Sequence, residues 1–151
     1  MGLVLRKAQL DDASAISTLI IAAIRQTNAN DYPAALIESL PEHFSAGQIA
    51  ARMSMRDTYV ALDAGVVIGT ASLDDMTVRS VFVLPEYQGR GAGLALMTQI
   101  EALALQRSIS TLSVPSSITA EGFYKRLGYA TIGEVYEGVE KIIVMTKTLV
   151  P

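Results

Sequence analysis

Cysteine and tryptophan are absent from the 151-residue chain, and histidine occurs once, at position 43. Without cysteine there are no disulfides, no thiolate metal sites and no cysteine nucleophile, a composition that fits a reducing compartment. No apolar stretch approaches the roughly 18–20 residues of a membrane-spanning helix. The formal net charge is −3, and the basic residues are scattered, with no cluster of the kind that binds nucleic-acid phosphates. We therefore expect a cytoplasmic protein that binds neither a membrane nor nucleic acid.

What the chain does contain is enough apolar material for one ordinary domain. Half of its residues are hydrophobic, which favours a packed globule over disorder. The length corresponds to one domain, and the sequence shows no linker, internal repeat or low-complexity segment. We expect a single domain over residues 1–151.

Hydrophobic periodicity divides the chain into strands and helices. Apolar runs predict strands at 3–8, 58–62, 66–73, 77–84, 112–114, 129–132 and 142–148. Helical spacing predicts four helices. The first begins after Asp12, the second spans 48–53, the third begins after Gly93 and the fourth spans 119–127. The unbroken apolar run from Val81 to Leu84 predicts a strand segment that is buried on both faces of the sheet. Pro115 is expected to end the strand predicted at 112–114. Early hairpins followed by strand–helix–strand crossovers indicate an α+β or mixed α/β fold.

Polar residues and a glycine predict where three of these helices begin or end. Asp11 or Asp12 is expected to cap the first helix, because a carboxylate there accepts unpaired N–H groups. Ser45 is expected to cap the second helix for the same reason. Gly128 stands where a helix commonly ends in a left-handed residue.

A glycine-rich loop, Gln88-Gly89-Arg90-Gly91-Ala92-Gly93, lies between a predicted strand and a predicted helix. The first N–H groups of a helix have no intrahelical partner, and the helix dipole favours an anion there. Glycines let a ligand approach the backbone and permit positive φ. The loop therefore predicts a cradle for a phosphate or diphosphate, the alternative being a plain glycine turn. A Rossmann fingerprint would need glycine where Leu94 or Leu96 stands, and a Walker Gly-Lys-Ser/Thr is absent.

The segment from Val81 to Met97, VFVLPEYQGRGAGLALM, resembles the acetyl-CoA motif of the GCN5-related N-acetyltransferase (GNAT) superfamily. The family pattern is Arg/Gln-x-x-Gly-x-Gly/Ala after a strand with an apolar-Val-x-Pro ending, and the order of elements also matches. The resemblance implies the acyl-CoA N-acyltransferase fold, with a mostly antiparallel mixed sheet flanked by about four helices. It implies acetyl-CoA as co-substrate and an amine as acceptor, and we expect no metal.

The resemblance also assigns residues to the coenzyme. In the family, the loop amides hold the diphosphate, and the preceding strand pairs its backbone with the pantetheine arm. The cofactor-binding residues expected on this basis are Phe82, Val83, Gln88, Gly89, Arg90, Gly91, Ala92, Gly93 and Ser117. For Ser117, capping of the following helix is the competing interpretation.

Residues 116–129 resemble a second family signature, Ala-x-x-Phe-Tyr-x-x-x-Gly-Phe, with Tyr129 in place of the final Phe. The resemblance implies that Tyr124 is catalytic and points toward the coenzyme sulfur. A phenol there can donate a hydrogen bond or a proton to the departing thiolate. Packing alone is the competing interpretation of Tyr124.

No residue is assigned as the general base. Thr77 and Arg79 stand where some relatives carry acidic side chains, and no carboxylate occurs between residues 76 and 85. A neutral amine drawn from solution is one alternative. The candidates for lining an acceptor site lie in the first two helices and their connection: Tyr32, Glu42, His43 and Phe44.

Two functions fit these observations. The first is direct transfer of an acetyl group to an amine of a small molecule or peptide. No covalent acyl-enzyme is expected, because the sequence shows no Ser-His-Asp constellation and no cysteine. The second is a non-catalytic acyl-CoA-binding regulatory or interaction domain, which the missing strand carboxylate favours. A homodimer is left open.

Overall fold

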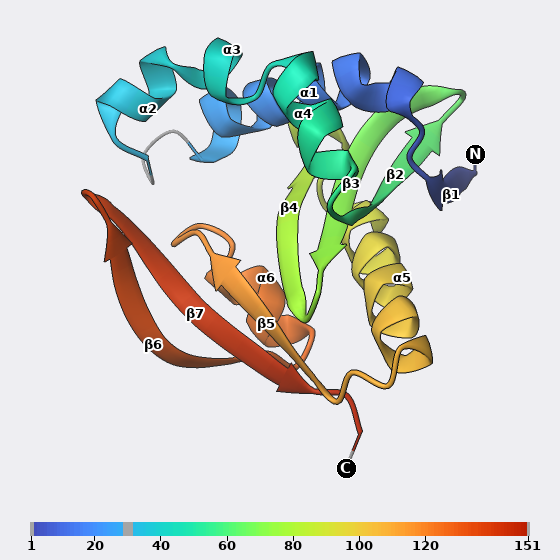
Figure 1. The fold of residues 1–151 in the computed structure, drawn as a ribbon, viewed down its shortest axis with the longest axis vertical. Coiled ribbons are helices and arrows are strands. Elements are labelled where there is room, and N and C mark those ends of the chain that lie inside the picture. The colour runs from blue at the N-terminus through green and yellow to red at the C-terminus, as the bar shows by residue number, and fades with distance from the viewer. Residues whose placement is uncertain (1, 29–31, 151) are drawn as a thin grey trace.

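The computed structural model describes residues 2–28 and 32–150, and it is a mixed α/β fold around one seven-stranded sheet (Figure 1). The strand order is β1-β2-β3-β4-β5-β7-β6, and all neighbours are antiparallel except β4 and β5. The elements in chain order are β1 (Leu3–Lys7), α1 (Ala13–Ala23), α2 (Ala34–Glu38), α3 (Leu40–His43), α4 (Ala46–Met53), β2 (Asp57–Asp63), β3 (Val66–Asp74), β4 (Thr77–Val83), α5 (Ala92–Gln106), β5 (Thr111–Ser116), α6 (Glu121–Arg126), β6 (Ala130–Glu137) and β7 (Glu140–Thr148).

The predicted strands and the four predicted helices are confirmed, with shifts at their ends. The structure adds two short helices, α2 and α3, which lack the periodic apolar run that a sequence reading detects. Residues 29–31, in the polar segment that follows the first helix, lie outside the described residues. None of the helices in the described ranges combines the length and the apolar character that a membrane crossing requires.

Helices cover both faces of the N-terminal part of the sheet. Val60 and Ala61 are consecutive, fully buried residues of β2 that belong to different clusters. Val60 clusters with Ile16 of α1 and Ile49 of α4, whereas Ala61 clusters with Leu96 of α5. Because consecutive strand residues face opposite sides, α1 and α4 cover one face and α5 the other.

The cap predictions have mixed outcomes. Ser45 caps α4, where its Oγ accepts the Gln48 N–H at 3.2 Å. Gly128 ends α6 in a left-handed conformation, with φ of +98°. The expectation for Asp12 is wrong in detail: its carboxylate accepts the N–H of Gln9 at 2.7 Å and binds no N–H of α1.

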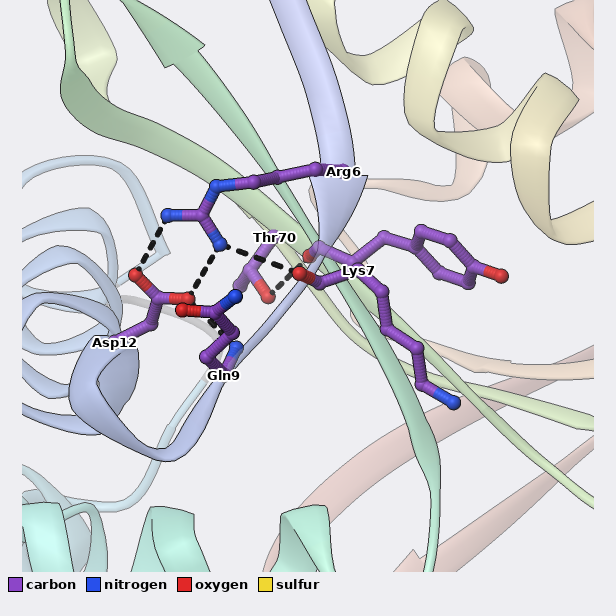
Figure 2. A network of polar contacts seen from close by, with 6 residues as sticks. Arg6, Lys7, Gln9, Asp12 and Thr70 are labelled. Carbon is purple, nitrogen blue, oxygen red and sulfur yellow. Dashed lines mark hydrogen bonds and ion pairs between the residues drawn. The ribbon is translucent and has the colours of Figure 1, made fainter.

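The carboxylate of Asp12 instead ties β1 to the start of α1 (Figure 2). Arg6 donates from its two terminal nitrogens to the two oxygens of Asp12, at 2.7 and 2.9 Å. This paired geometry is the stronger form of an arginine–carboxylate contact. Beside it, the hydroxyl of Thr70 on β3 donates to the carbonyl of Tyr59 on β2 at 3.0 Å. The cluster fastens the N-terminal strand and helix to the sheet.

The sheet opens between β4 and β5. These parallel neighbours share one register position, Thr77 with Ser113, and diverge beyond it toward their C-terminal ends (Figure 1). The expectation that the run from Val81 to Leu84 is buried on both faces is wrong, since each of its residues is partly exposed. Pro115 does not stop β5 but lies inside it. A proline is tolerated there because β5 has a strand neighbour on only one side at that point.

Candidate active site

Two cavities meet in the gap between β4 and β5. The first, about 370 Å³, extends toward the glycine loop, and we call it the loop-side cavity. The second, about 420 Å³, extends toward α2, α3 and α4, and we call it the helix-side cavity. Four residues line both: Val81, Phe82, Ala120 and Tyr124. The gap therefore offers one continuous site that two ligands can enter from opposite directions.

The glycine loop presents main-chain N–H groups at the start of α5. Gly89 and Gly91 have φ of +77° and +89°, and a Cβ added to either would meet nothing within 4 Å. Within the described ranges, no backbone hydrogen bond outside the regular elements uses an N–H of residues 89–94 as donor. These donors and the positive end of the α5 dipole suit an anion. Their conformation needs glycine at positions 89 and 91 because other residues rarely adopt positive φ.

Gly93 has a different structural reason to be glycine. A Cβ at this position would lie 3.0 Å from two ring atoms of Phe123 and 4.0 Å from Val83. Gly93 therefore lets the first turn of α5 pack closely against α6 and β4. It also lines the loop-side cavity, together with Gln88 and Gly89.

Two other loop residues predicted to bind the coenzyme, Arg90 and Ala92, line a different cavity. Arg90 stacks over the Tyr87 ring at 5.4 Å and lines a separate cavity with Asp63, as does the buried Ala92. The amide of Gln88 donates to the Val83 carbonyl at 3.3 Å. Like Gly91, neither Arg90 nor Ala92 lines the loop-side cavity, so their contact with a coenzyme stays a prediction.

Arg126 is a cation of the loop-side cavity that the sequence analysis did not single out. It lies at the end of α6 and lines the cavity opposite the glycine loop. No pattern in the sequence distinguishes it from the neighbouring Lys125. Only the packing of α6 beside the gap brings this guanidinium toward the same space as the loop N–H groups.

Strand β4 forms the wall between the two cavities. Phe82 lines both of them, and Val83 lines the loop-side cavity. Ser80 has φ of +55°, and the pairing of β3 with β4 shifts register next to it. Such a bulge bends a strand and redirects its side chains. The bend accompanies the divergence of β4 from β5.

Tyr124 stands where the two cavities join. It projects from α6, is 5 % exposed, and packs edge-on against Phe123 and Tyr129, at 5.1 and 5.8 Å between ring centroids. Burial raises the pKa of the Tyr124 phenol well above its usual range, and the neighbouring Tyr32 adds to the effect. The phenol therefore keeps its proton at physiological pH and can act as a donor.

Ser117 has the contact expected of a helix cap. Its Oγ accepts the N–H of Ala120 at 3.2 Å, and the residue lines the helix-side cavity. The structure does not bring its side chain to the loop-side cavity, where the other predicted coenzyme contacts gather.

The helix-side cavity contains more charged groups than the sequence indicated. Tyr32, His43 and Phe44 line it as expected, whereas Glu42 does not. Burial lowers the pKa of His43, and the nearby Arg52 lowers it further, so the imidazole is neutral at pH 7. The charged lining residues that the sequence analysis missed as a group are Arg52, Arg56, Arg79, Glu137 and Glu140.

The described residues contain no group of three or more His, Asp or Glu side chains that could hold a metal ion. The two cavities offer main-chain donors, a protonated phenol, guanidinium groups and carboxylates. An anion at the loop and a second ligand on the helix side would meet at Tyr124.

Comparison with known proteins agrees with this geometry. A family model described as an acetyltransferase (GNAT) domain matches residues 28–149. The uncharacterized N-acetyltransferase CT2212 of Chlorobaculum tepidum is 30% identical over 136 residues, which are 87% of this chain and 77% of that protein. A GCN5-related N-acetyltransferase from Rhodopseudomonas palustris superposes with a TM-score of 0.87 at 30% identity, covering 98% of this chain and 96% of that one.

A third protein shares the fold at lower identity and was solved with its coenzyme. The PaiA N-acetyltransferase of Thermoplasma acidophilum, in complex with coenzyme A, superposes with a TM-score of 0.83 at 19% identity, covering 98% of this chain and 99% of that one. The family model alone spans most of the present sequence, so this chain belongs to the GNAT acetyltransferase family.

Proposed function

We propose that the protein is an acetyl-CoA-dependent N-acetyltransferase that passes the acetyl group directly to an amine of a small molecule or peptide. The observation that carries the proposal is the junction of two cavities at Tyr124. One cavity ends at unpaired helix N–H groups, and the other ends at a polar lining of side chains. The acyl donor belongs on the loop side and the acceptor on the helix side.

The residues of the loop side fit a diphosphate and its pantetheine arm. The N–H groups of residues 89–94 have no backbone acceptor outside the helix in the part of the chain that the structure describes, and Arg126 adds a positive charge to the loop-side cavity. Beyond Thr77, the edge of β4 that faces β5 has no strand partner. The carbonyl of Val83 accepts the Gln88 amide, so the remaining main-chain groups of this edge near Phe82 and Val83 are those open to an amide-bearing chain laid along the strand. The coenzyme supplies the thioester carbon that is attacked.

Transfer requires one bond to form and one to break. The amine nitrogen bonds to the carbonyl carbon, the carbon–sulfur bond breaks, and the sulfur leaves with its electron pair. The protonated phenol of Tyr124 donates to that sulfur, because burial keeps the proton on the oxygen. The proton lost by the amine goes to water or to a cavity group. His43, Glu137 and Glu140 are the candidate acceptors in the lining.

The competing function is a non-catalytic acyl-CoA-binding domain. It is favoured by the absence of carboxylates on β4 between its first residue and the loop. Glu137 and Glu140 weaken that argument, because they bring carboxylates to the acceptor side from another part of the sheet.

Release of free thiol from acetyl-CoA, measured across a panel of amines, amino acids, polyamines and peptide N-termini, decides between the two. An N-acetyltransferase releases thiol only with its acceptor and yields an acetylated product visible by mass spectrometry. A binding domain gains thermal stability from acetyl-CoA but releases no thiol with any acceptor. If acetyl-CoA leaves the melting temperature unchanged, neither function holds.

A further inference from the structure

One wall of the helix-side cavity carries three arginines from different parts of the chain. Arg52 is on α4, Arg56 lies between α4 and β2, and Arg79 is on β4. The proposed transfer reaction uses none of them. Their convergence on the acceptor side therefore needs a separate explanation.

Arg56 is the least satisfied of the three. Its single hydrogen bond to protein goes to the Ser80 hydroxyl at 3.3 Å, and it has no ion pair in the described part of the chain. Burial lowers the pKa of Arg56 and the charges of Arg79 and Arg52 lower it further, whereas the charge of Asp74, the smallest of the four contributions, raises it. The guanidinium nevertheless stays protonated. A partly buried cation beside other cations is costly unless an anion joins it.

The other two arginines differ in how firmly they are held. Arg52 donates to the His43 carbonyl at 2.8 Å and lies 5.2 Å over the Phe44 ring. Arg79 reaches Asp74 only at 3.7 Å, with both side chains more than 40 % exposed. An exposed pair of this kind contributes little. Arg79 is therefore available, with Arg56, to a ligand in the cavity.

The lining of the same cavity also includes acidic residues. Glu137 ends β6 and Glu140 begins β7, and both line the cavity near the turn between these strands. In Figure 1 the β6–β7 turn lies well apart from α4 and β4. A ligand with positive charge alone would meet three guanidinium groups, and one with negative charge alone would meet two carboxylates. The lining complements a ligand that carries both charges.

Building on the proposed acetyl transfer, we propose that the acceptor is an amine that also carries an oxyanion, a carboxylate or a phosphate, bound by Arg56 and Arg79. The planar guanidinium suits either oxyanion through paired hydrogen bonds. The ammonium form of the amine enters on the glutamate side and loses its proton before attack. A cavity of about 420 Å³ accommodates a small molecule of this type.

Binding tests the proposal without relying on turnover. The protein saturated with coenzyme A is titrated calorimetrically with three series of matched chain length: ω-amino acids, n-alkylamines and α,ω-diamines. We expect the best amino acid to bind about tenfold or more tightly than its alkylamine, the effect of a charge-assisted hydrogen bond. β-Alanine against phosphoethanolamine then separates carboxylate from phosphate. Amino acids that bind no better than the alkylamines overturn the proposal.

Two variants test whether Arg56 and Arg79 cause the tighter binding of amino acids relative to alkylamines. Arg56→Gln and Arg79→Gln should each remove most of the tenfold preference while leaving alkylamine binding unchanged. Arg107→Gln, at the far end of α5 and paired with Asp57, is the control that should keep it. If Arg56→Gln does not fold, binding of the amino acids and alkylamines to Arg79→Gln, a change at an exposed residue, still tests the proposal. A preference that survives both changes also overturns the proposal.

Thiol release with the same compounds separates this inference from the proposed function. Transfer to alkylamines and amino acids with equal KM would leave the acetyltransferase standing and remove the oxyanion site. Tight, arginine-dependent binding of the amino acids without any transfer would keep the site and remove the catalytic function.

Discussion

The two halves of the site are built in different ways. The loop-side cavity depends on main-chain N–H groups from a continuous stretch, residues 89–94, held open by left-handed glycines. The helix-side cavity depends on side chains from regions scattered along the chain, among them α3, α4, β4 and the β6–β7 turn. A contiguous main-chain site leaves a spacing in the sequence, whereas a site assembled from scattered side chains leaves none. The comparison explains why the sequence pointed to the glycine loop and not to most of the charged lining of the helix-side cavity.

The largest expected effect, on acetyl-CoA binding, comes from a change in the glycine loop of the loop-side cavity. Gly91→Val should abolish acetyl-CoA binding, because valine strongly disfavours the φ of +89° on which the start of α5 depends. In the wild type, acetyl-CoA at about 100 times its Kd should add roughly 2.7 kcal/mol of stability, seen as a rise in Tm. The variant should lose that rise.

Gly65→Val is the matched control for backbone strain. Gly65 has φ of +81° with open space around it, but it lies in the β2–β3 turn, away from both cavities. Its variant should have a lower Tm and still respond to acetyl-CoA. Loss of the response in both variants would mean that strain, and not the loop, explains the result.

The second effect concerns the residue that joins the two halves. Tyr124→Phe should lower kcat about tenfold to a hundredfold, near the low end for a general acid, because a thiolate is a comparatively good leaving group. The acetyl-CoA-induced rise in Tm should remain. Since burial raises the pKa of Tyr124, the wild-type rate should show no loss from its ionisation below pH 10.

Tyr129→Phe separates the role of the Tyr124 hydroxyl from aromatic packing. The Tyr129 hydroxyl donates to Glu101 at 2.8 Å, in a network with Lys147, and the residue lines neither cavity. Its loss should cost about 1 kcal/mol of stability and leave kcat unchanged. Equal rates for wild type and Tyr124→Phe would remove Tyr124 from the mechanism.

The sequence was informative where the local chain decides the structure. The glycine spacing, the Ser45 cap and the left-handed Gly128 all depend on a few consecutive residues, and all three predict the observed local conformation. Burial of the run from Val81 to Leu84 was mispredicted, because whether a strand is covered depends on a neighbour that diverges from it. Arg56 and Glu137 had no local signal, since they lie 81 positions apart in the chain.

A smaller effect distinguishes two roles within the glycine loop. Gly93→Ala should cost about 1–3 kcal/mol of stability, because its Cβ would lie 3.0 Å from the Phe123 ring. The variant should still bind acetyl-CoA, since its φ is ordinary. Gly47→Ala on α4 meets only the Ser45 hydroxyl, at 3.9 Å, and should raise Tm slightly. If Gly93→Ala keeps full stability and loses binding, the glycine serves the ligand directly.

The smallest expected effect, on stability, concerns the ion pair of Arg6 and Asp12, which lies outside both cavities (Figure 2). Hydrogen bonds from Arg6 lower the pKa of Asp12, despite an opposing contribution from burial. A carboxyl with a lowered folded-state pKa stabilises the protein above its unfolded pKa of about 3.9, and this contribution is lost as pH falls through the folded value. Asp12→Asn should therefore cost about 1 kcal/mol at pH 7, and less in more acidic solution.

Thermal unfolding of wild type and Asp12→Asn between pH 7 and pH 2.5 measures this difference. The two Tm curves should converge below pH 4, while acetyl-CoA affinity at pH 7 stays the same for both proteins. A constant gap at all pH values would show that Asp12 acts through packing and not through its charge. A change in acetyl-CoA affinity would show instead that the contact between β1 and α1 influences the conformation of the glycine loop. The loop-side cavity would then depend on residues outside the continuous stretch that supplies its N–H groups.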